Sequence, residues 1–479
     1  MALVDQYDGL SMTDQLPVLE LPNLHQPSDG PHLTVSDKVE DDWPPPGDAW
    51  PASPETKVTI KELDVALKDP ETDPEHVHML YKNLPSPRVP YLESKTRHLL
   101  LRHLAIIERK DEQSMLRYFS IIDDMKSTAI PLTVREWTSA MSFAARYVTR
   151  STPTEVEAAL YIWREMEHVA GVKANHATFN VLFDVACKAG KLNLAEMIYK
   201  EMAARGLEYN RYHHVSLITF YGLKGDGLGL REAYKNLVEA NEIVDTTVIN
   251  SLIAGLLKCD EDQAATAVYE RMKSMHVARG GAPSPPPSFK SKRKITSTLL
   301  NMGEMVKKNP ALREQVEKDV RIAPDVQTYR ILVNHFSVKM GDLHRTTQFL
   351  DEMRWFDLPL HGAMFLALLK GFATHGGVRY SHWTERRLDS VWAAFLQATE
   401  HGGEEQNDGL YISRWMAIWA VRAFAKCSGK SKMIEVWEEL RVRWNPEQAD
   451  LDFVFSLMRP LLEGEDMALK QNDWLEGFR

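Results

Sequence analysis

Cysteine is scarce in this sequence: Cys187, Cys259 and Cys427 are its only three among 479 residues, and they stand far apart. An odd number of distant thiols forms neither a disulfide framework nor the close spacing of a zinc site. We therefore expect buried free thiols in a reducing compartment. The sequence also lacks any run approaching the roughly 18 apolar residues that a membrane-spanning helix needs, so we expect no membrane span.

Several other signals are missing as well. Runs of alternating β-branched residues, which are typical of half-buried strands, do not occur. We find no pairing of a nucleophile with a base and no metal-ligand spacing. Only about 30 residues follow the last predicted helical hairpin, which is too few for an appended catalytic module. We therefore predict a protein that is not an enzyme and that needs no cofactor and no metal.

The charge of the chain is unevenly distributed. The formal net charge is -10, but residues 1–60 contain eleven acidic residues and only two lysines, Lys38 and Lys57. The remaining chain is therefore close to neutral. A neutral body can carry a basic groove, although nucleic-acid-binding domains are usually clearly basic, so the electrostatic objection to nucleic acid weakens but remains.

The apolar pattern predicts an all-α protein. Residues 1–55 are acidic and rich in proline and show no periodicity, so we expect them to be disordered. From about residue 60 to residue 460, apolar positions recur at steps of three and four residues, which is the period of amphipathic helices. Residues 56–276 form one predicted array of helices and residues 325–460 a second, ending in a cap; residues 461–479 form a tail.

An internal repeat of about 35 residues underlies both arrays. A charged residue followed by methionine recurs at Met125, Met166, Met202, Met272 and Met353, at intervals of 41, 36, 70 and 81 residues. Two helices per unit would bury their apolar stripes against each other and against the next unit. The longest interval contains residues 277–324, which we interpret as an insertion with a proline-rich start and a helical stretch at 295–319.

The clearest repeat unit is His176 to Asn210, HATFNVLFDVACKAGKLNLAEMIYKEMAARGLEYN. Its Thr-Phe-Asn opening, Cys-Lys-Ala-Gly-Lys-Leu turn, small Ala195 and Lys-Glu-Met ending closely resemble the pentatricopeptide repeat. Further units are expected at 93–133, 134–175, 211–245, from 246 onward and at 326–360, with poorer matches at 60–92, 361–400 and 409–446. The resemblance implies a right-handed superhelical solenoid of helix-turn-helix repeats.

The resemblance also implies which residues would contact RNA. In such repeats, a polar residue near the start of the first helix and the last residue of the unit together read one base. The matching residues are Thr138 with Asn175, a pair that favours adenine in the family, and Asn180 with Asn210, a pair that favours a pyrimidine. Asn250 also matches, but its partner Asp325 lies beyond the insertion. Helix capping is the alternative role for Asn180 and Asn210.

Two further groups of residues have two interpretations each. Lys290, Lys292, Arg293 and Lys294 form a basic cluster that either contacts RNA phosphates or belongs to a solvated linker. The C-terminal tryptophans either pack a helical cap or stack on bases; they are Trp392, Trp415, Trp419, Trp437 and Trp444.

The function that the resemblance implies is binding of single-stranded organellar RNA by a monomer. Fungal mitochondrial members of the family are the most similar in character, so we expect a mitochondrial factor for maturing small-subunit ribosomal RNA, splicing introns or stabilising transcripts. No organellar presequence is visible in the sequence. The alternative is a protein-binding scaffold, for example one associated with the mitoribosomal small subunit, which the acidic balance and the poorer later repeats would favour.

Overall fold

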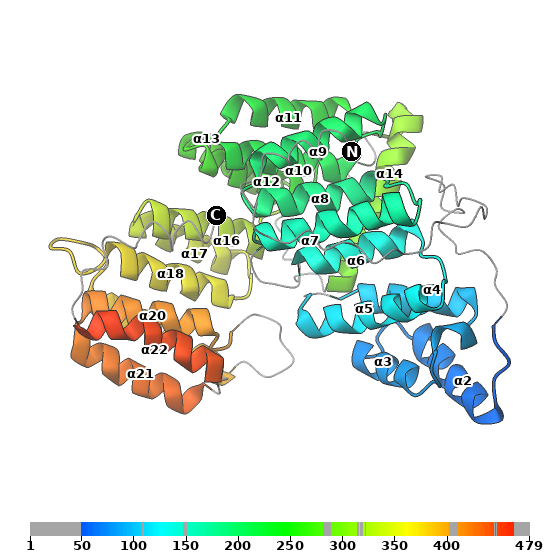
Figure 1. Cartoon of the computed structure of the whole chain (residues 1–479). Helices are drawn as coiled ribbons and strands as arrows, with labels where there is room; N and C mark the ends of the chain where they lie inside the picture. The colour runs from blue at the N-terminus through cyan, green and yellow to red at the C-terminus, as the bar shows by residue number, and fades with distance from the viewer. Residues whose placement is uncertain are drawn as a thin grey trace. The chain divides into compact units, whose positions relative to one another are not determined.

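The structure, a computed structural model, describes residues 49–463 except 108–109, 147–150, 281–288, 314–315, 317–319, 321, 402–409, 445 and 447. Every regular element among these residues is helical, as the sequence predicted (Figure 1). The acidic segment 1–48 and the tail from residue 464 lie outside the described residues. The chain divides into two compact units, residues 1–216 and 217–479, which we call the first and second unit.

The first unit is a series of helical hairpins. Its elements are α2 (Pro54–Lys68), α3 (Pro74–Lys82), η2 (Val89–Tyr91), α4 (Ser94–Ala105), α5 (Glu112–Ser127), α6 (Val134–Arg146), α7 (Pro153–Arg164), η3 (Glu165–Val169), α8 (His176–Lys188) and α9 (Leu192–Ala204). The first helices pack on one another in sequence order, α4 on α6 and α6 on α8. The second helices α5, α7 and α9 pack beside their own first helices.

Helix α10 (Arg211–Lys224) contains the boundary between the two units, and the second unit continues the hairpin series. Its further elements are α11 (Gly227–Glu239), α12 (Thr246–Lys258), α13 (Asp262–Ala278), α14 (Phe289–Lys308), η4 (Pro310–Leu312), α16 (Val326–Asn334), η5 (His335–Lys339), α17 (Leu343–Trp355), α18 (Gly362–His375), α19 (Glu385–His401), α20 (Arg414–Cys427), α21 (Lys430–Arg443) and α22 (Gln448–Glu463). Here α12, α16, α18 and α20 form the layer of successive first helices.

Local sequence signals set the hairpin boundaries. Asn175 caps α8 by accepting a hydrogen bond from the Thr178 N–H, and Asp325 caps α16 by accepting one from the Thr328 N–H. The turn between α8 and α9 contains Gly190 at φ +72°, a left-handed conformation that glycine adopts without a Cβ penalty. The predicted unit His176–Asn210 therefore coincides with one hairpin.

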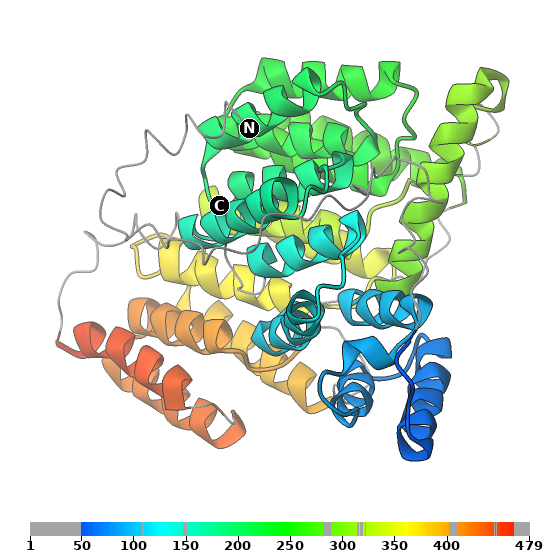
Figure 2. The same cartoon turned by 45° about the vertical axis from the view of Figure 1, so that its right-hand side comes forward.

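Three details differ from the predicted pattern. The stretch 60–92, predicted as a degenerate half-repeat, is part of a two-helix element that starts at Pro54. The inserted helix α14 begins at Phe289, earlier than the predicted start at 295, and ends at Lys308, where η4 follows within the predicted stretch 295–319. A further helix, α22, follows the last predicted hairpin. In Figure 2, α14 runs steeply across the direction of the neighbouring helices of its unit.

The C-terminal tryptophans pack the end of the second unit. Trp392, Trp419 and Trp437 are buried in one apolar cluster formed by α18 to α22, and Trp415 and Trp444 pack against it half-buried. This arrangement agrees with the predicted cap. The three buried rings are at most 6% exposed and leave no open face for stacking on a base.

Candidate nucleic-acid interface

The first helices of neighbouring hairpins are joined by a recurring polar contact. At three junctions, α4 to α6, α6 to α8 and α12 to α16, the fifth residue of one first helix meets the third residue of the next. His98 Nδ1 lies 3.3 Å from a carboxylate oxygen of Glu136, and the hydroxyls of Thr138 and Thr178 are 2.8 Å apart. The predicted base-reading residue Thr138 is therefore part of a row of polar contacts between hairpins.

Asn175 belongs to the same contact. Its Oδ1 accepts hydrogen bonds from the Thr178 N–H at 3.1 Å and from the Thr178 hydroxyl at 3.2 Å. Thr178 thus links the two predicted residues Thr138 and Asn175. The side-chain NH₂ of Asn175 has no hydrogen-bond partner among the described residues, and the residue is half-buried. Asn175 consequently caps α8 with its oxygen and keeps its amide donors available.

The pair Asn180 and Asn210 is arranged similarly at the next junction. Asn180 Oδ1 accepts a hydrogen bond from the Ser216 hydroxyl at 3.2 Å, while its NH₂ group has no partner among the described residues. Asn210 Oδ1 accepts one from the Tyr212 N–H at 3.0 Å and also contacts the ring of His213. Burial lowers the pKa of His213 to about 4, so this ring is neutral at physiological pH. Capping therefore accounts for Asn210 but not for Asn180, whose NH₂ group has no partner among the described residues.

In the second unit the equivalent contact spans the insertion. Asn250 Nδ2 donates to Asp325 Oδ1 at 3.0 Å, and the Thr328 hydroxyl donates to Asn250 Oδ1 at 2.8 Å. The sequence pattern left the pairing of Asn250 open because Asp325 lies beyond residues 277–324. The structure brings them together because α12 packs directly on α16. Both ends of the Asn250 amide are engaged and the residue is buried.

A second regular feature is a cation at the C-terminal end of the first helices. The last residue is Arg146 in α6, Lys188 in α8, Lys224 in α10, Lys258 in α12 and Lys339 in η5. All five are exposed or half-exposed. A helix C-terminus favours a cation electrostatically whether or not a ligand is present. In the sequence, this feature corresponds to Lys188, the first lysine of the Cys-Lys-Ala-Gly-Lys-Leu turn. We did not predict its recurrence from the sequence, because the net charge of the whole chain is acidic.

In the first unit this feature includes a carboxylate. Asp184 on α8 lies 2.6 Å from Arg146 Nη2 and 2.8 Å from Lys188 Nζ. Burial raises the pKa of Asp184, but the charges and hydrogen bonds of Arg146 and Lys188 outweigh it and hold that pKa below its ordinary value. One anion for two cations leaves this spot with a positive charge.

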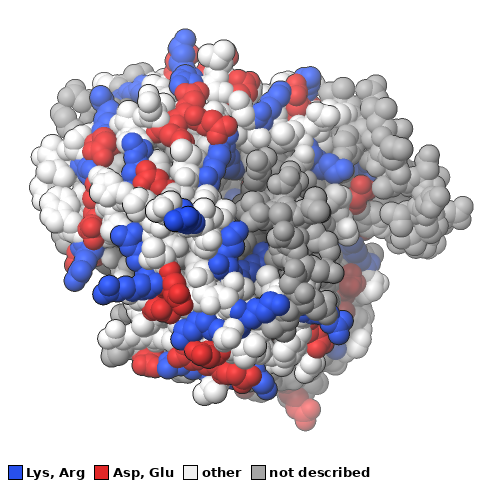
Figure 3. Space-filling view, turned by 90° about the vertical axis from the view of Figure 1, so that its left-hand side faces the viewer, with Lys and Arg blue, Asp and Glu red and all other residues white. Residues whose placement is uncertain are grey.

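The predicted basic cluster at the insertion is only partly described. Lys290, Lys292 and Arg293 lie in the first turn of α14, but their side chains are outside the described residues. Lys294 is exposed. Figure 3 shows Lys and Arg interspersed with Asp and Glu on the face that it draws, without one continuous basic field. The cations on this face therefore do not form a single patch.

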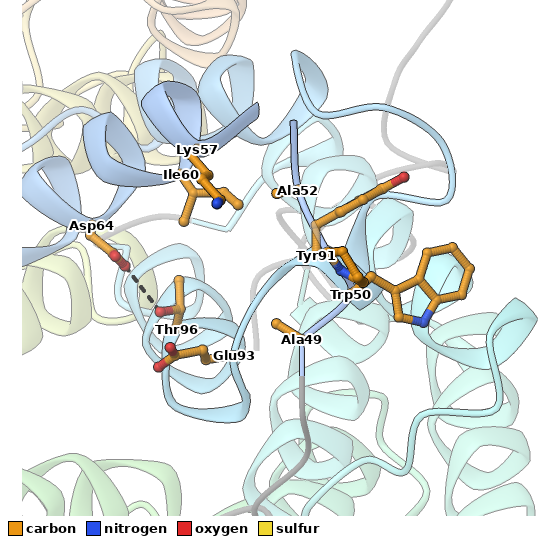
Figure 4. Close-up of a pocket in the computed structure, with 10 residues that line it drawn as sticks. Ala49, Trp50, Ala52, Lys57, Ile60, Asp64, Tyr91, Glu93 and Thr96 are labelled. Carbon is orange, nitrogen blue, oxygen red and sulfur yellow. Dashed lines mark hydrogen bonds between the residues drawn. The ribbon is translucent and has the colours of Figure 1, made fainter. Parts of the chain in front are cut away.

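A small pocket lies at the start of the first unit (Figure 4). It encloses about 300 Å³ and is lined in part by Trp50, Lys57 and Tyr91. The Trp50 and Tyr91 rings meet edge to face at 5.7 Å, and the Thr96 hydroxyl donates to Asp64 at 3.0 Å. Its polar groups are thus partly satisfied internally.

The described residues contain neither a membrane-spanning helix nor a group of metal ligands. No described helix has the length and apolar character that crossing a bilayer requires. In the same part of the chain, no group of three or more His, Cys, Asp or Glu side chains is arranged to hold a metal ion.

The stacked hairpins and their repeated junctions define a helical-repeat protein. Two segments, residues 177–207 in the first unit and 248–277 in the second, match the family model described as PPR repeat. A curated pentatricopeptide repeat-containing protein of Arabidopsis thaliana is 34% identical over 105 residues, which is 22% of this chain and 19% of that protein's length. Both units of the chain therefore contain a pentatricopeptide repeat.

Solved structures of helical proteins are similar at low identity. The maize pentatricopeptide repeat protein PPR10 is 14% identical over 87% of this chain and 55% of its own, with a TM-score of 0.37. Yeast Rmd9p, solved in complex with a 16-nucleotide target RNA, is 12% identical over 82% of this chain and 88% of its own, with a TM-score of 0.40.

Proposed function

We propose that this chain binds single-stranded RNA along the face formed by its first helices. The observation that carries the proposal is the pair of junctions in the first unit. There, Asn175 and Asn180 use their side-chain oxygens inside the protein and keep their NH₂ groups without described partners. An amide donor held rigidly by its own oxygen is suited to a hydrogen bond with a base edge.

The two junctions would contact successive bases. As the family resemblance implies, Thr138 with Asn175 would favour adenine and Asn180 with Asn210 a pyrimidine. Asn250 is the remaining proposed reader, although its engaged amide makes it a weaker one than Asn180. The cations at the ends of the first helices would contact the phosphates that follow these bases, because unpaired strands are held largely by their backbone charge. The cluster Lys290, Lys292, Arg293 and Lys294 would add phosphate contacts.

The biological role that we propose is a non-catalytic one in mitochondrial RNA maturation. A strand held along the first helices is protected from nucleases or presented to other factors, such as those that process small-subunit ribosomal RNA, splice introns or stabilise transcripts. The mitoribosomal small subunit is a proposed partner, and the protein would act as a monomer. These parts of the proposal rest on the family resemblance.

The test is selection of bound RNA from a random-sequence single-stranded pool by the purified full-length protein, followed by sequencing. We expect enrichment of adenine followed by a pyrimidine in the wild type, and loss of that enrichment in Thr138→Ala plus Asn180→Ala. We expect affinity for the selected RNA to fall about ten-fold or more. Asn193→Ala, which removes an exposed amide from the second helix α9, is the matched control.

A protein-binding scaffold is the second candidate, which the interspersed charges in Figure 3 and the net charge of -10 favour. Ultraviolet cross-linking of the tagged protein in its own cells separates the two. Recovery of RNA from one organellar site supports the RNA-binding proposal. Recovery of stable protein partners without cross-linked RNA, together with no enrichment from the random pool, would reject it in favour of the scaffold.

A further inference from the structure

The last hairpins of the second unit place three cations on neighbouring first helices. Arg330 is the fifth residue of α16, and Lys370 and Arg422 are the ninth residues of α18 and α20. Helix α18 packs on both α16 and α20, so the three side chains belong to one continuous layer. We call Arg330, Lys370, Arg422 and the neighbouring Trp419 the cationic cluster.

Trp419 contacts two of these cations. The Lys370 Nζ lies 5.6 Å from the centroid of its ring and the Arg422 Cζ lies 5.1 Å from it. Such contacts stabilise a cation over an aromatic face. The indole N–H of Trp419 is buried and has no hydrogen-bond partner among the described residues. A buried donor without an acceptor is costly, so a ligand that accepts a hydrogen bond would stabilise this site.

The electrostatic environment of the cluster also favours an anion. Burial, and then the charge of Arg330, lower the pKa of Lys370 to about 8. Burial likewise lowers the pKa of Arg422 below its ordinary value. Lys370 is 8% exposed and Trp419 is 6% exposed, whereas Arg330 is open to solvent. The cluster therefore reaches from solvent into the protein and carries like charges that a bound anion would relieve.

We propose that the cationic cluster of Arg330, Lys370, Trp419 and Arg422 binds a phosphate group of the RNA strand. This inference rests on the proposed function. It means that the last hairpins contact the sugar-phosphate backbone of the RNA and do not read a base. All four groups are hydrogen-bond donors without acceptor capacity, which fits the non-bridging oxygens of a phosphodiester. Base stacking on Trp419 does not compete, because its ring is only 6% exposed and already contacts the two cations.

The position of the cluster within the repeat supports this assignment. Arg330 occupies the fifth position of its first helix, where Thr138, Asn180 and Asn250 stand in earlier hairpins. The ninth position, which is Asp184 in α8, is cationic in both α18 and α20. At both positions a cation stands where an earlier hairpin has a neutral or acidic group. In α16 a phosphate-binding residue type thus stands at the position where earlier hairpins have a proposed base-reading one.

The experiment measures the salt dependence of binding to a random-sequence single-stranded RNA pool, using the full-length chain between about 50 and 200 mM salt. Removing one cation that neutralises a phosphate of a single strand lowers the slope of log affinity against log salt by about 0.7. We expect this decrease, with several-fold weaker binding, in Arg330→Gln and in Lys370→Gln. Lys235→Gln, an exposed cation on the second helix α11, should leave the slope unchanged.

The slope distinguishes phosphate binding from a structural role, since a smaller fraction of folded protein lowers the amount bound without changing the slope. Arg330 is exposed, so its variant is expected to fold even if Lys370→Gln does not. A wild-type slope in Arg330→Gln and in folded Lys370→Gln, with RNA still bound, would overturn this inference and leave the proposed function standing. Failure of the wild type to bind RNA would overturn both.

Discussion

A buried histidine in the first hairpin predicts that acid destabilises the first unit. His78 on α3 is 7% exposed, and its Nε2 lies 3.0 Å from the Ser120 hydroxyl on α5. Burial, followed by the charges of Lys82 and Arg117, lowers the pKa of His78 to about 4. The ring is therefore neutral when folded, and its protonation favours the unfolded chain, where the ordinary value is 6.5.

The magnitude follows from these two values. Above about pH 6.5 the ring is neutral in both states and its stabilising effect is complete; the effect is lost as the pH falls toward 4. Each pKa unit corresponds to about 1.4 kcal/mol, so the full loss is about 3 kcal/mol, of which about 2 kcal/mol is already lost at about pH 5. Replacing His78 by glutamine removes the titration and retains a partner for Ser120.

The assay is urea unfolding of the full-length chain, followed by circular dichroism at about pH 7 and about pH 5. We expect the difference in unfolding free energy between His78→Gln and the wild type to move by about 2 kcal/mol in favour of the variant at the lower pH. His76→Gln removes an exposed histidine from the same helix and should follow the wild type at both pH values. A difference for His78→Gln that does not change with pH would refute the reasoning.

Two further predictions concern packing and hydrogen bonding in the second unit, both measured by urea unfolding. Gly222→Ala should lower the free energy of unfolding by about 1–3 kcal/mol, because the new Cβ would lie 2.7 Å from a backbone atom of the adjacent helix α12. In the control Gly303→Ala, the new Cβ would meet no atom closer than 3.4 Å, so the free energy of unfolding should stay the same or rise. Thr328→Val should lower the free energy of unfolding by about 1–3 kcal/mol, because it leaves the buried side-chain oxygen of Asn250 without its hydrogen-bond donor. The control Thr347→Val, on the exposed face of α17, should change the free energy of unfolding by less than about 0.5 kcal/mol. Equal effects within either pair would contradict the respective reasoning.

The fold was predictable because its signals are local and repeated. Helix periodicity, the caps at Asn175 and Asp325 and the turn glycine at Gly190 each act within a few residues, and the repeat supplies them several times. Helix α22 lies mostly within the stretch to residue 460 that was predicted to be helical, but its bounds were not predicted, because it follows the last hairpin and belongs to no repeat. Helices outside a repeat are stabilised mainly by tertiary packing, which a single sequence does not display.

The candidate site was predictable only in part. Asn180 and Asn250 occupy the same position of their repeats, yet one keeps its NH₂ group available and the other has both amide ends engaged inside the protein. The difference arises from the partner residue, which is Ser216 in one case and Asp325 with Thr328 in the other. The cationic cluster was also missed, because Arg330, Lys370 and Arg422 meet only after three hairpins have stacked.

The insertion shows why spacing along the chain and spacing in the repeat differ. Asn250 and Asp325 are 75 residues apart, but their side chains are hydrogen-bonded as in neighbouring repeats. The second helix α13 also meets α16, with the Tyr269 hydroxyl 3.0 Å from that of Tyr329. The inserted helix α14 leaves this register intact because it packs on the edge of its unit, where Lys307 pairs with the buried Glu242. The interval of 81 residues between Met272 and Met353 therefore interrupts the repeat along the sequence, but it does not interrupt the packing of successive first helices. Any RNA strand following the first helices would pass from α12 to α16 without a gap.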